Sequence, residues 1–138
     1  MRDSSARWLG YAGLFPFVGC ALAAHDVSSL AGLALQALVA YAALIATFLG
    51  GIHWGFGFAS GRSGWALFGW GVTPSLLAWV ALLLPVQAGL LLLSATLVVA
   101  FLVDRRVYPR FGAEAWLSLR LQLSAVAVLC CLVGAWAA

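Results

Sequence analysis

Apolar residues fill long runs of this chain, and short polar segments separate those runs. The pattern predicts helices at about residues 6–24, 30–60, 65–84, 86–103 and 113–137. Each run approaches or exceeds the roughly 17–25 residues that cross a bilayer, and none carries the polar face of a water-exposed helix. We therefore expect an all-α fold, an integral membrane bundle of five transmembrane helices in a single polytopic domain, residues 1–138.

Composition supports a membrane protein. Apolar residues make up 65% of the chain and charged residues 8%, whereas soluble domains carry about 25% charged residues. The net charge of +3 does not gather into a basic stripe with exposed aromatics, so nucleic acid is not an expected partner. Cys20, Cys130 and Cys131 lie inside apolar runs without metal-ligand spacing, which is typical of packing residues.

The positive charges predict the orientation. The chain has no lysine, and the arginines lie in the N-terminal segment, in the turn after residue 60, in the connection at 104–112 and in the first turns of the last helix. The other connections and the C-terminus carry none. Because cytoplasmic segments retain positive charge, we expect a cytoplasmic N-terminus and a periplasmic C-terminus in a bacterial inner membrane.

Two local features of the predicted helices stay open. Arginines before the first apolar run resemble the start of a signal peptide, yet we expect this segment to be retained as the first helix. Pro16 and Pro74 lie inside predicted helices and favour kinks, but the sequence does not decide whether either helix bends.

The helix at 30–60 carries the most informative sequence. At about 1.5 Å per residue it would measure about 45 Å, against a hydrocarbon core of about 30 Å, so it must tilt, project or bend at Gly50-Gly51. His53 shares one helical face with Gly50 and Gly57. Gly51 and Gly55 form a second small-residue stripe. We expect these glycines to be helix-packing positions.

Polar side chains from three predicted helices lie at a similar depth. His53 should lie about 10 Å below the cytoplasmic surface, and Arg120 at a similar depth in the last helix. Asp104 ends the fourth helix on that side, and Trp116 lies one turn before Arg120. Charges inside a span are costly unless paired or snorkelling, and they commonly mark function. Trp54 and Tyr108 complete the candidate ligand-binding set.

The residue types narrow what such a site could hold. His25 lies on the opposite side of the membrane, so no second imidazole is available for haem, and too few ligands are present for a metal. No catalytic residue set and no phosphate-binding glycine loop is recognisable. The cofactor is thus unknown, and an aromatic, cationic pocket favours a quinone or an anionic lipid.

Several motifs resemble a known family. Residues 9–17 (LGYAGLFPF), 48–55 (FLGGIHWG) and 116–120 (WLSLR), together with Asp104, are similar to the domain-of-unknown-function 3429 membrane family of proteobacteria and mitochondria, which includes transmembrane-protein-69-like proteins. The resemblance covers nearly the whole chain. It implies a polytopic inner-membrane protein with His53, Asp104, Trp116 and Arg120 at the matching polar positions. It does not imply any particular activity.

Three functional hypotheses remain. The first is a non-enzymatic binding or accessory subunit whose pocket of His53, Asp104 and Arg120 holds a quinone or anionic lipid, as a homo-oligomer or within a larger membrane complex. The second is a small oligomeric transporter or proton pathway through His53, although few polar residues continue outward from it. The last is a membrane enzyme with His53 as general base. A purely structural polar cluster stays an alternative to all three.

Overall fold

The structure is a computed structural model that describes residues 4–26, 29–62 and 64–138, and the regular elements in these ranges are all helical. The all-α prediction is confirmed. In chain order the elements are α1 (Ser4–Ala12), α2 (Leu14–Ala23), α3 (Leu30–Ser60), α4 (Trp65–Leu83), α5 (Val86–Val107), the 3-10 turns η1 (Tyr108–Phe111) and η2 (Glu114–Trp116), and α6 (Leu117–Ala137).

The first predicted helix is two helices, with the break at Gly13. Pro16 has no N–H to donate to the carbonyl of Ala12, and its ring crowds that carbonyl, which disfavours a regular helix through this turn. The hydroxyl of Tyr41 on α3 donates a hydrogen bond to the Gly13 carbonyl at 2.7 Å, which ties the break to the bundle. In contrast, α4 remains a single helix across Pro74.

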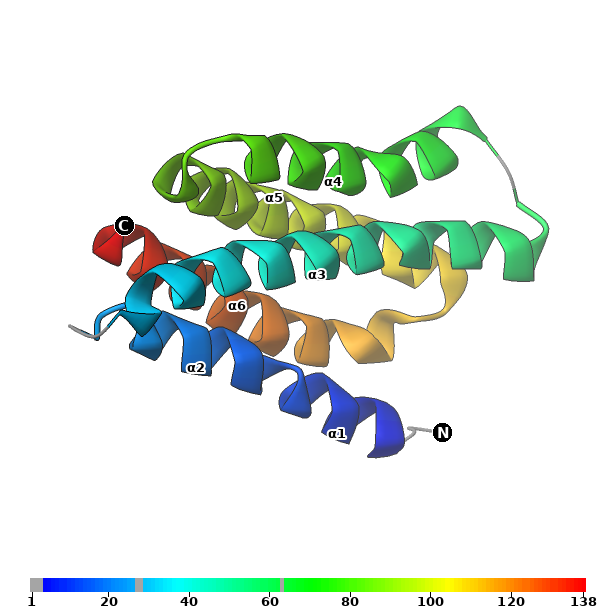
Figure 1. Ribbon diagram of the computed structural model, residues 1–138. Coiled ribbons are helices and arrows are strands. Elements are labelled where there is room, and N and C mark those ends of the chain that lie inside the picture. Colours follow the sequence, from blue (N-terminus) through cyan, green and yellow to red (C-terminus); the bar gives the residue numbers. More distant parts are fainter. Residues whose placement is uncertain (1–3, 27–28, 63) are drawn as a thin grey trace.

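Four helical segments in the described ranges are long and apolar enough to cross a membrane: Leu30–Ser60, Trp65–Leu83, Val86–Phe111 and Glu114–Ala137. The α1–α2 segment is not among them, because its halves have 9 and 10 residues. It nevertheless runs alongside the others, antiparallel to α3 (Figure 1). Length and composition therefore support four membrane spans, and they do not support the fifth predicted span.

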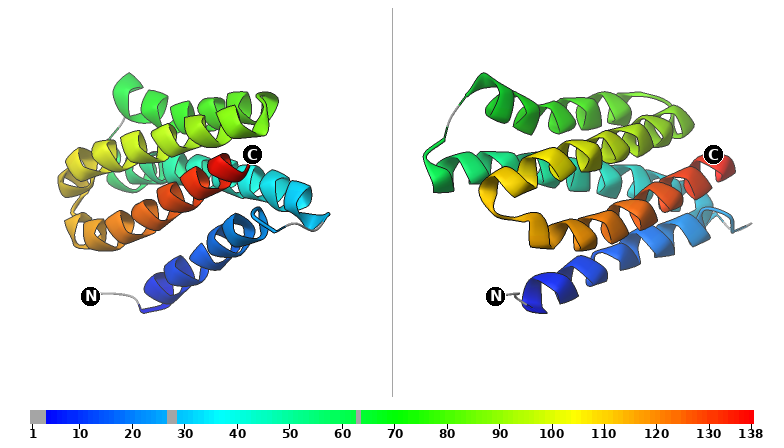
Figure 2. Two further views of the ribbon diagram at one scale, coloured as in Figure 1. Left: turned by 90° about the vertical axis from the view of Figure 1, so that its left-hand side faces the viewer. Right: turned by 180° about the vertical axis from the view of Figure 1, so that it is seen from behind.

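Successive segments run antiparallel, so α3 and α5 point one way and α1–α2, α4 and α6 the other (Figures 1 and 2). Helix α4 and the α1–α2 segment lie at opposite edges of the bundle. Between them, α3, α5 and α6 surround a core that includes Leu38, Leu90, Leu93 and Leu97. The N-terminal end of α1, the α3–α4 turn and the α5–α6 connection lie at one end of the molecule, and α3 projects beyond its neighbours there. This arrangement brings the arginine-bearing segments to a common end.

The α5–α6 connection differs from its predicted bounds. Helix α5 continues to Val107 rather than ending near residue 103, and α6 begins at Leu117 rather than near residue 113. Asp104 is therefore inside the last turns of α5, where it is 1% exposed. Pro109 and Gly112, whose φ is +71°, end the helical path and turn the chain back.

Glycines let the helices approach closely at some of the expected positions. A Cβ at Gly50 would collide with the carbonyl of Gly71 on α4, and one at Gly57 would lie 2.6 Å from the Phe68 ring. Both predicted packing positions therefore do contact α4. Gly51 and Gly55 lie on the outward face of α3, and among the described residues no heavy atom lies within 4 Å of a Cβ built at either. Their role in packing stays a prediction.

Candidate functional site

A buried carboxylate joins three helices. Asp104 on α5 accepts a hydrogen bond from His53 on α3, with 2.7 Å between His53 Nε2 and Asp104 Oδ1. Its other oxygen accepts two hydrogen bonds from Arg120 on α6, at 2.9 Å from Nε and 2.6 Å from a terminal nitrogen. His53 and Asp104 are each 1% exposed and Arg120 is 7% exposed. The predicted convergence of these three residues is thus present, and we refer to them as the polar triad.

Arg120 is held at both ends of its guanidinium group. Its second terminal nitrogen donates to the hydroxyl of Ser124, one turn further along α6, at 2.7 Å. The side chain therefore does not reach toward the end of the bundle, as a snorkelling arginine would. It lies across the interior, fixed by hydrogen bonds to a carboxylate and a hydroxyl.

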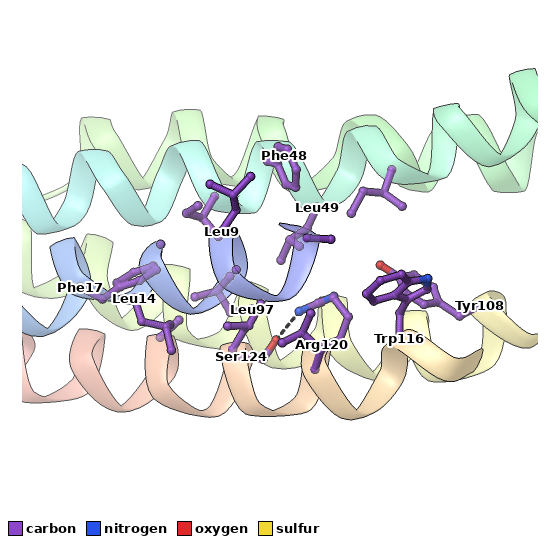
Figure 3. A pocket seen from close by; sticks show the side chains of 18 of the residues that line it. Leu9, Leu14, Phe17, Phe48, Leu49, Leu97, Tyr108, Trp116, Arg120 and Ser124 are labelled. Atoms are coloured by element: carbon purple, nitrogen blue, oxygen red, sulfur yellow. Dashed lines mark hydrogen bonds between the residues drawn. The ribbon is translucent and has the colours of Figure 1, made fainter. Parts of the chain in front are cut away.

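A cavity of about 650 Å³ lies beside the triad, between the α1–α2 segment and helices α3, α5 and α6. Its walls are mainly apolar. Figure 3 shows Tyr108 and Trp116 at one end and Leu14 and Phe17 at the other, with Arg120 and Ser124 between them on the α6 side. The cavity is thus elongated, with Tyr108 and Trp116 at the end near the α5–α6 connection and mainly apolar side chains toward the opposite end, where the Tyr41 hydroxyl is bonded to the Gly13 carbonyl.

The six predicted ligand-binding residues divide into three groups. Tyr108, Trp116 and Arg120 line the cavity. His53 and Asp104 do not line it and instead support Arg120 from behind. This corrects the expectation that all three triad residues form the pocket wall. The reason is that the long side chain of Arg120 both lines the cavity and reaches Asp104, which is buried on α5.

Trp54 lies away from the cavity. Its indole N–H donates to the Phe68 carbonyl at 2.9 Å, and its ring packs edge-on against Phe68 with centroids 4.8 Å apart. The tryptophan also covers Gly71, where a Cβ would collide with the indole. Trp54 therefore fastens α3 to α4, and the expectation that it belongs to the pocket fails because it faces a different neighbour from His53.

Aromatic rings pack against one another at the end of the site that lies near the α5–α6 connection. Phe56 stacks on Phe111 with centroids 4.9 Å apart and meets Tyr108 edge-on at 5.2 Å. Arg62, in the α3–α4 turn, lies 5.1 Å from the Phe111 ring centroid and donates to the Arg110 carbonyl at 3.0 Å. These contacts hold the α5–α6 connection against α3, which positions Tyr108 at the end of the cavity.

The sequence matches the family described as "Protein of unknown function (DUF3429)" over residues 3–136. The chain belongs to this family. It is 35% identical over 129 residues to "Transmembrane protein 69" of Xenopus tropicalis, in an alignment that covers 89% of this chain and 50% of the relative. The chain thus spans half the length of that relative. No solved structure matches it.

Family membership confirms the resemblance on the LGYAGLFPF, FLGGIHWG and WLSLR segments, and the chain is a multi-pass membrane protein. Two contributors to the site were missed from the sequence. Ser124 could have been found, because it follows Arg120 by one helical turn and shares its face. The residues of α1–α2 that line the cavity could not have been identified from the sequence, because no local sequence pattern shows which helices border a cavity.

Proposed function

We propose that this protein binds a membrane-soluble amphiphile with a neutral polar ring and a long apolar tail, of the isoprenoid quinone class, as a non-enzymatic binding or accessory subunit. The observation that carries the proposal is the elongated cavity with Tyr108 and Trp116 at one end, Arg120 along its α6 wall and mainly apolar side chains toward the other end. Its volume of about 650 Å³ lies within the range of roughly 300–1,000 Å³ that is usual for small-molecule sites.

The charge of the site favours a neutral head group over an anionic one. Asp104 makes two hydrogen bonds to Arg120 and compensates its positive charge. With a neutral His53 the triad carries no net charge, so a buried anion beside it would lack a counter-charge. A quinone carbonyl needs only a hydrogen-bond donor, and each terminal nitrogen of Arg120 has one N–H beyond those used by Ser124 and Asp104.

A transporter or proton pathway is less well supported. The hydroxyl groups that would continue such a path bond to their own helices: Thr47 donates to the Ala43 carbonyl and Thr73 to the Gly69 carbonyl, at 2.9 and 2.8 Å. Hydroxyl groups satisfied in this way offer no chain of exchangeable partners. Beyond the triad, the apolar core of α3 and α5 is built from leucine, alanine and Val39. The buried hydroxyls of Ser94 and Thr96 on α5 also donate to carbonyls of their own helix.

In the proposed arrangement α1–α2 forms a fifth membrane-crossing segment, and the arginine-rich end faces the cytoplasm. The positive-inside rule supports this orientation, because the arginine-bearing segments gather at one end of the bundle. The polar end of the cavity then lies toward the cytoplasmic leaflet. The assignment to a bacterial inner membrane rests on the same rule and stays a prediction, as does a homo-oligomer or larger complex on the Gly51 and Gly55 face.

The test is ligand retention by a cavity-filling variant. Ala127 on α6 is buried and lines the cavity, whereas Ala125 on the same helix is exposed. Protein purified in lipid nanodiscs is extracted, and its quinones and lipids are quantified by mass spectrometry for wild type, Ala127→Leu and the control Ala125→Leu. We expect a quinone near one per chain in wild type and control and its loss in Ala127→Leu.

Two other results would contradict the proposal in different ways. An anionic phospholipid retained at the same stoichiometry and lost in Ala127→Leu would keep the cavity as a lipid site and reject the head-group class. Equal content of every quinone and lipid in the three proteins would reject a binding function for the cavity.

A further inference from the structure

The cavity wall is closed on some sides and open on one. On the α5 and α6 sides its lining residues Leu97 and Arg120 are buried. Between α1 and α3, two lining residues are largely exposed, Leu9 at 72% and Phe48 at 68%. Figure 3 shows Leu9 and Phe48 on the side of the cavity away from Arg120 and Ser124. The cavity is therefore open to the outside of the bundle between α1 and α3.

Contacts between α1 and α6 explain why the opening lies on the α3 side. The Tyr11 hydroxyl on α1 donates a hydrogen bond to Gln122 Oε1 on α6, at 2.9 Å. Gly10 also lies close to α6, because a Cβ built there would be 3.2 Å from Leu123 Cδ1. Helix α1 thus packs on α6 and closes that side of the cavity.

The end of the cavity farthest from the α5–α6 connection is closed as well. Phe17 is buried there, and its ring packs edge-on against Tyr41 with centroids 4.9 Å apart. A volume of about 650 Å³ suits a drug-sized molecule, whereas natural isoprenoid quinones carry tails of many isoprene units. A long tail that follows the cavity therefore meets a wall at Phe17, and the opening at Leu9 and Phe48 offers it an exit.

The opening lies at a depth where the surroundings are hydrocarbon. Phe48 belongs to the candidate span Leu30–Ser60 and precedes the end of that helix by about 18 Å, at about 1.5 Å per residue. In the proposed arrangement this depth falls within a hydrocarbon core of about 30 Å. A ligand dissolved in the bilayer meets the opening directly, and a ligand dissolved in water does not.

We propose that the opening between Leu9 and Phe48 is a lateral portal, which admits the amphiphile from the bilayer and lets its tail extend back into the bilayer after the head group has bound. This inference rests on the proposed function and narrows its ligand to amphiphiles with a tail longer than the cavity. The carbons beyond the portal stay in hydrocarbon in the free and the bound state. Further lengthening of the tail should therefore leave the affinity unchanged.

The test maps the ring and the tail of a bound quinone on the wild-type protein in nanodiscs. One benzoquinone carries a photoreactive diazirine beside its ring, and a series carries the diazirine at successive positions along a long isoprenoid tail. Labelled residues are located by mass spectrometry, with and without about a tenfold excess of the same quinone without diazirine. Because two ligands share one site by mass action, the excess should lower specific labelling about tenfold.

The expected positions have matched controls on the same segments. Tail labelling that the competitor lowers should fall on Leu9 and Phe48. Leu22 on α2 and Leu44 on α3 are similarly exposed but do not line the cavity, so the competitor should not change their labelling. Ring labelling that the competitor lowers should fall near Trp116, at the end of the cavity close to the α5–α6 connection.

A substitution at the portal provides a second test. Leu9→Trp adds bulk at the opening, and Leu22→Trp adds the same bulk at a similarly exposed position outside the cavity. We expect the amount of long-tailed quinone retained during purification to fall several-fold in Leu9→Trp and to stay at the wild-type level in Leu22→Trp. A quinone with a methyl group in place of the tail should bind all three proteins alike.

The outcomes separate the portal from the proposed function. Competitor-sensitive tail labelling at Leu14 and Phe17 alone would overturn the portal and leave a quinone site that encloses its tail. Equal retention of long-tailed quinone by Leu9→Trp and wild type would also overturn the portal. Absence of competitor-sensitive labelling with every probe would overturn the proposed function itself.

Discussion

Asp104 and Arg120 are joined by two hydrogen bonds to one carboxylate oxygen, at 2.9 and 2.6 Å, inside a bundle made almost entirely of apolar side chains. Because the pair links α5 to α6 and Asp104 also accepts from His53 on α3, one carboxylate fixes the relative positions of three helices. Arg120 is thereby held in one orientation at the cavity wall.

Replacing Asp104 alone should lower the unfolding free energy more than replacing Asp104 and Arg120 together. Asp104→Ala leaves a buried guanidinium uncompensated, so we expect a loss of about 3–5 kcal/mol in unfolding free energy. Asp104→Ala combined with Arg120→Met removes both charges and should lose less than the single variant. Reversible unfolding in mixed micelles measures both. A double variant that is less stable than Asp104→Ala would show that the charge balance is not what stabilises the triad.

Adjacent glycines on α3 should respond in opposite ways to alanine. Gly50→Ala places a methyl group against the Gly71 backbone and must push α3 and α4 apart, at a cost of about 1–3 kcal/mol. Gly51→Ala meets no described heavy atom within 4 Å and should be neutral or stabilising by up to about 1 kcal/mol. Thermal unfolding of the two variants measures the difference. A destabilising Gly51→Ala would instead reveal a partner helix on the outward face.

The Tyr41 hydroxyl should stabilise the break between α1 and α2. Tyr41→Phe removes its hydrogen bond to the Gly13 carbonyl but keeps the ring, which packs edge-on against Phe17 at 4.9 Å. We expect a loss of about 0.5–1.5 kcal/mol and faster amide exchange confined to residues near Gly13. Hydrogen exchange followed by mass spectrometry would test this. Exchange that increases uniformly along α3 would contradict a local role.

The orientation can be tested with tags at the two termini. In the proposed arrangement, five crossings would put the two termini on opposite sides of the membrane, with the N-terminal end of α1 on the same side as the α3–α4 turn and the α5–α6 connection. In bacterial cells, we expect an N-terminal fluorescent fusion to be bright and a C-terminal alkaline phosphatase fusion to be active. Both termini on the same side would mean that α1–α2 does not cross the membrane and that the molecule has the four spans alone.

Much of the architecture could be predicted from the order of apolar and polar residues. The bounds of α3 agree with the prediction, and the end of α4 differs by one residue, because Gly61 and Pro85 stop those helices by local geometry. His53, Asp104 and Arg120 could be placed near one another from their predicted depths, because charged side chains in an apolar bundle are stable only when they are paired. The lengths of the helices and the meeting of the charged residues follow from bilayer thickness, helix rise and the cost of burying charge. All three can be applied to the sequence alone.

The tertiary structure decided which neighbouring helix each of those side chains contacts. Only the packing of α3 against both α4 and α5 shows that Trp54 bonds to Phe68 while His53, one residue earlier, bonds to Asp104. The contrast between Gly50, which touches the Gly71 backbone, and Gly51, which faces outward, depends on the rotation of α3 about its axis. In a helix apolar on all sides, that rotation leaves no periodic signal, so the sequence determined which groups must be buried together and the fold decided which of them meet the cavity.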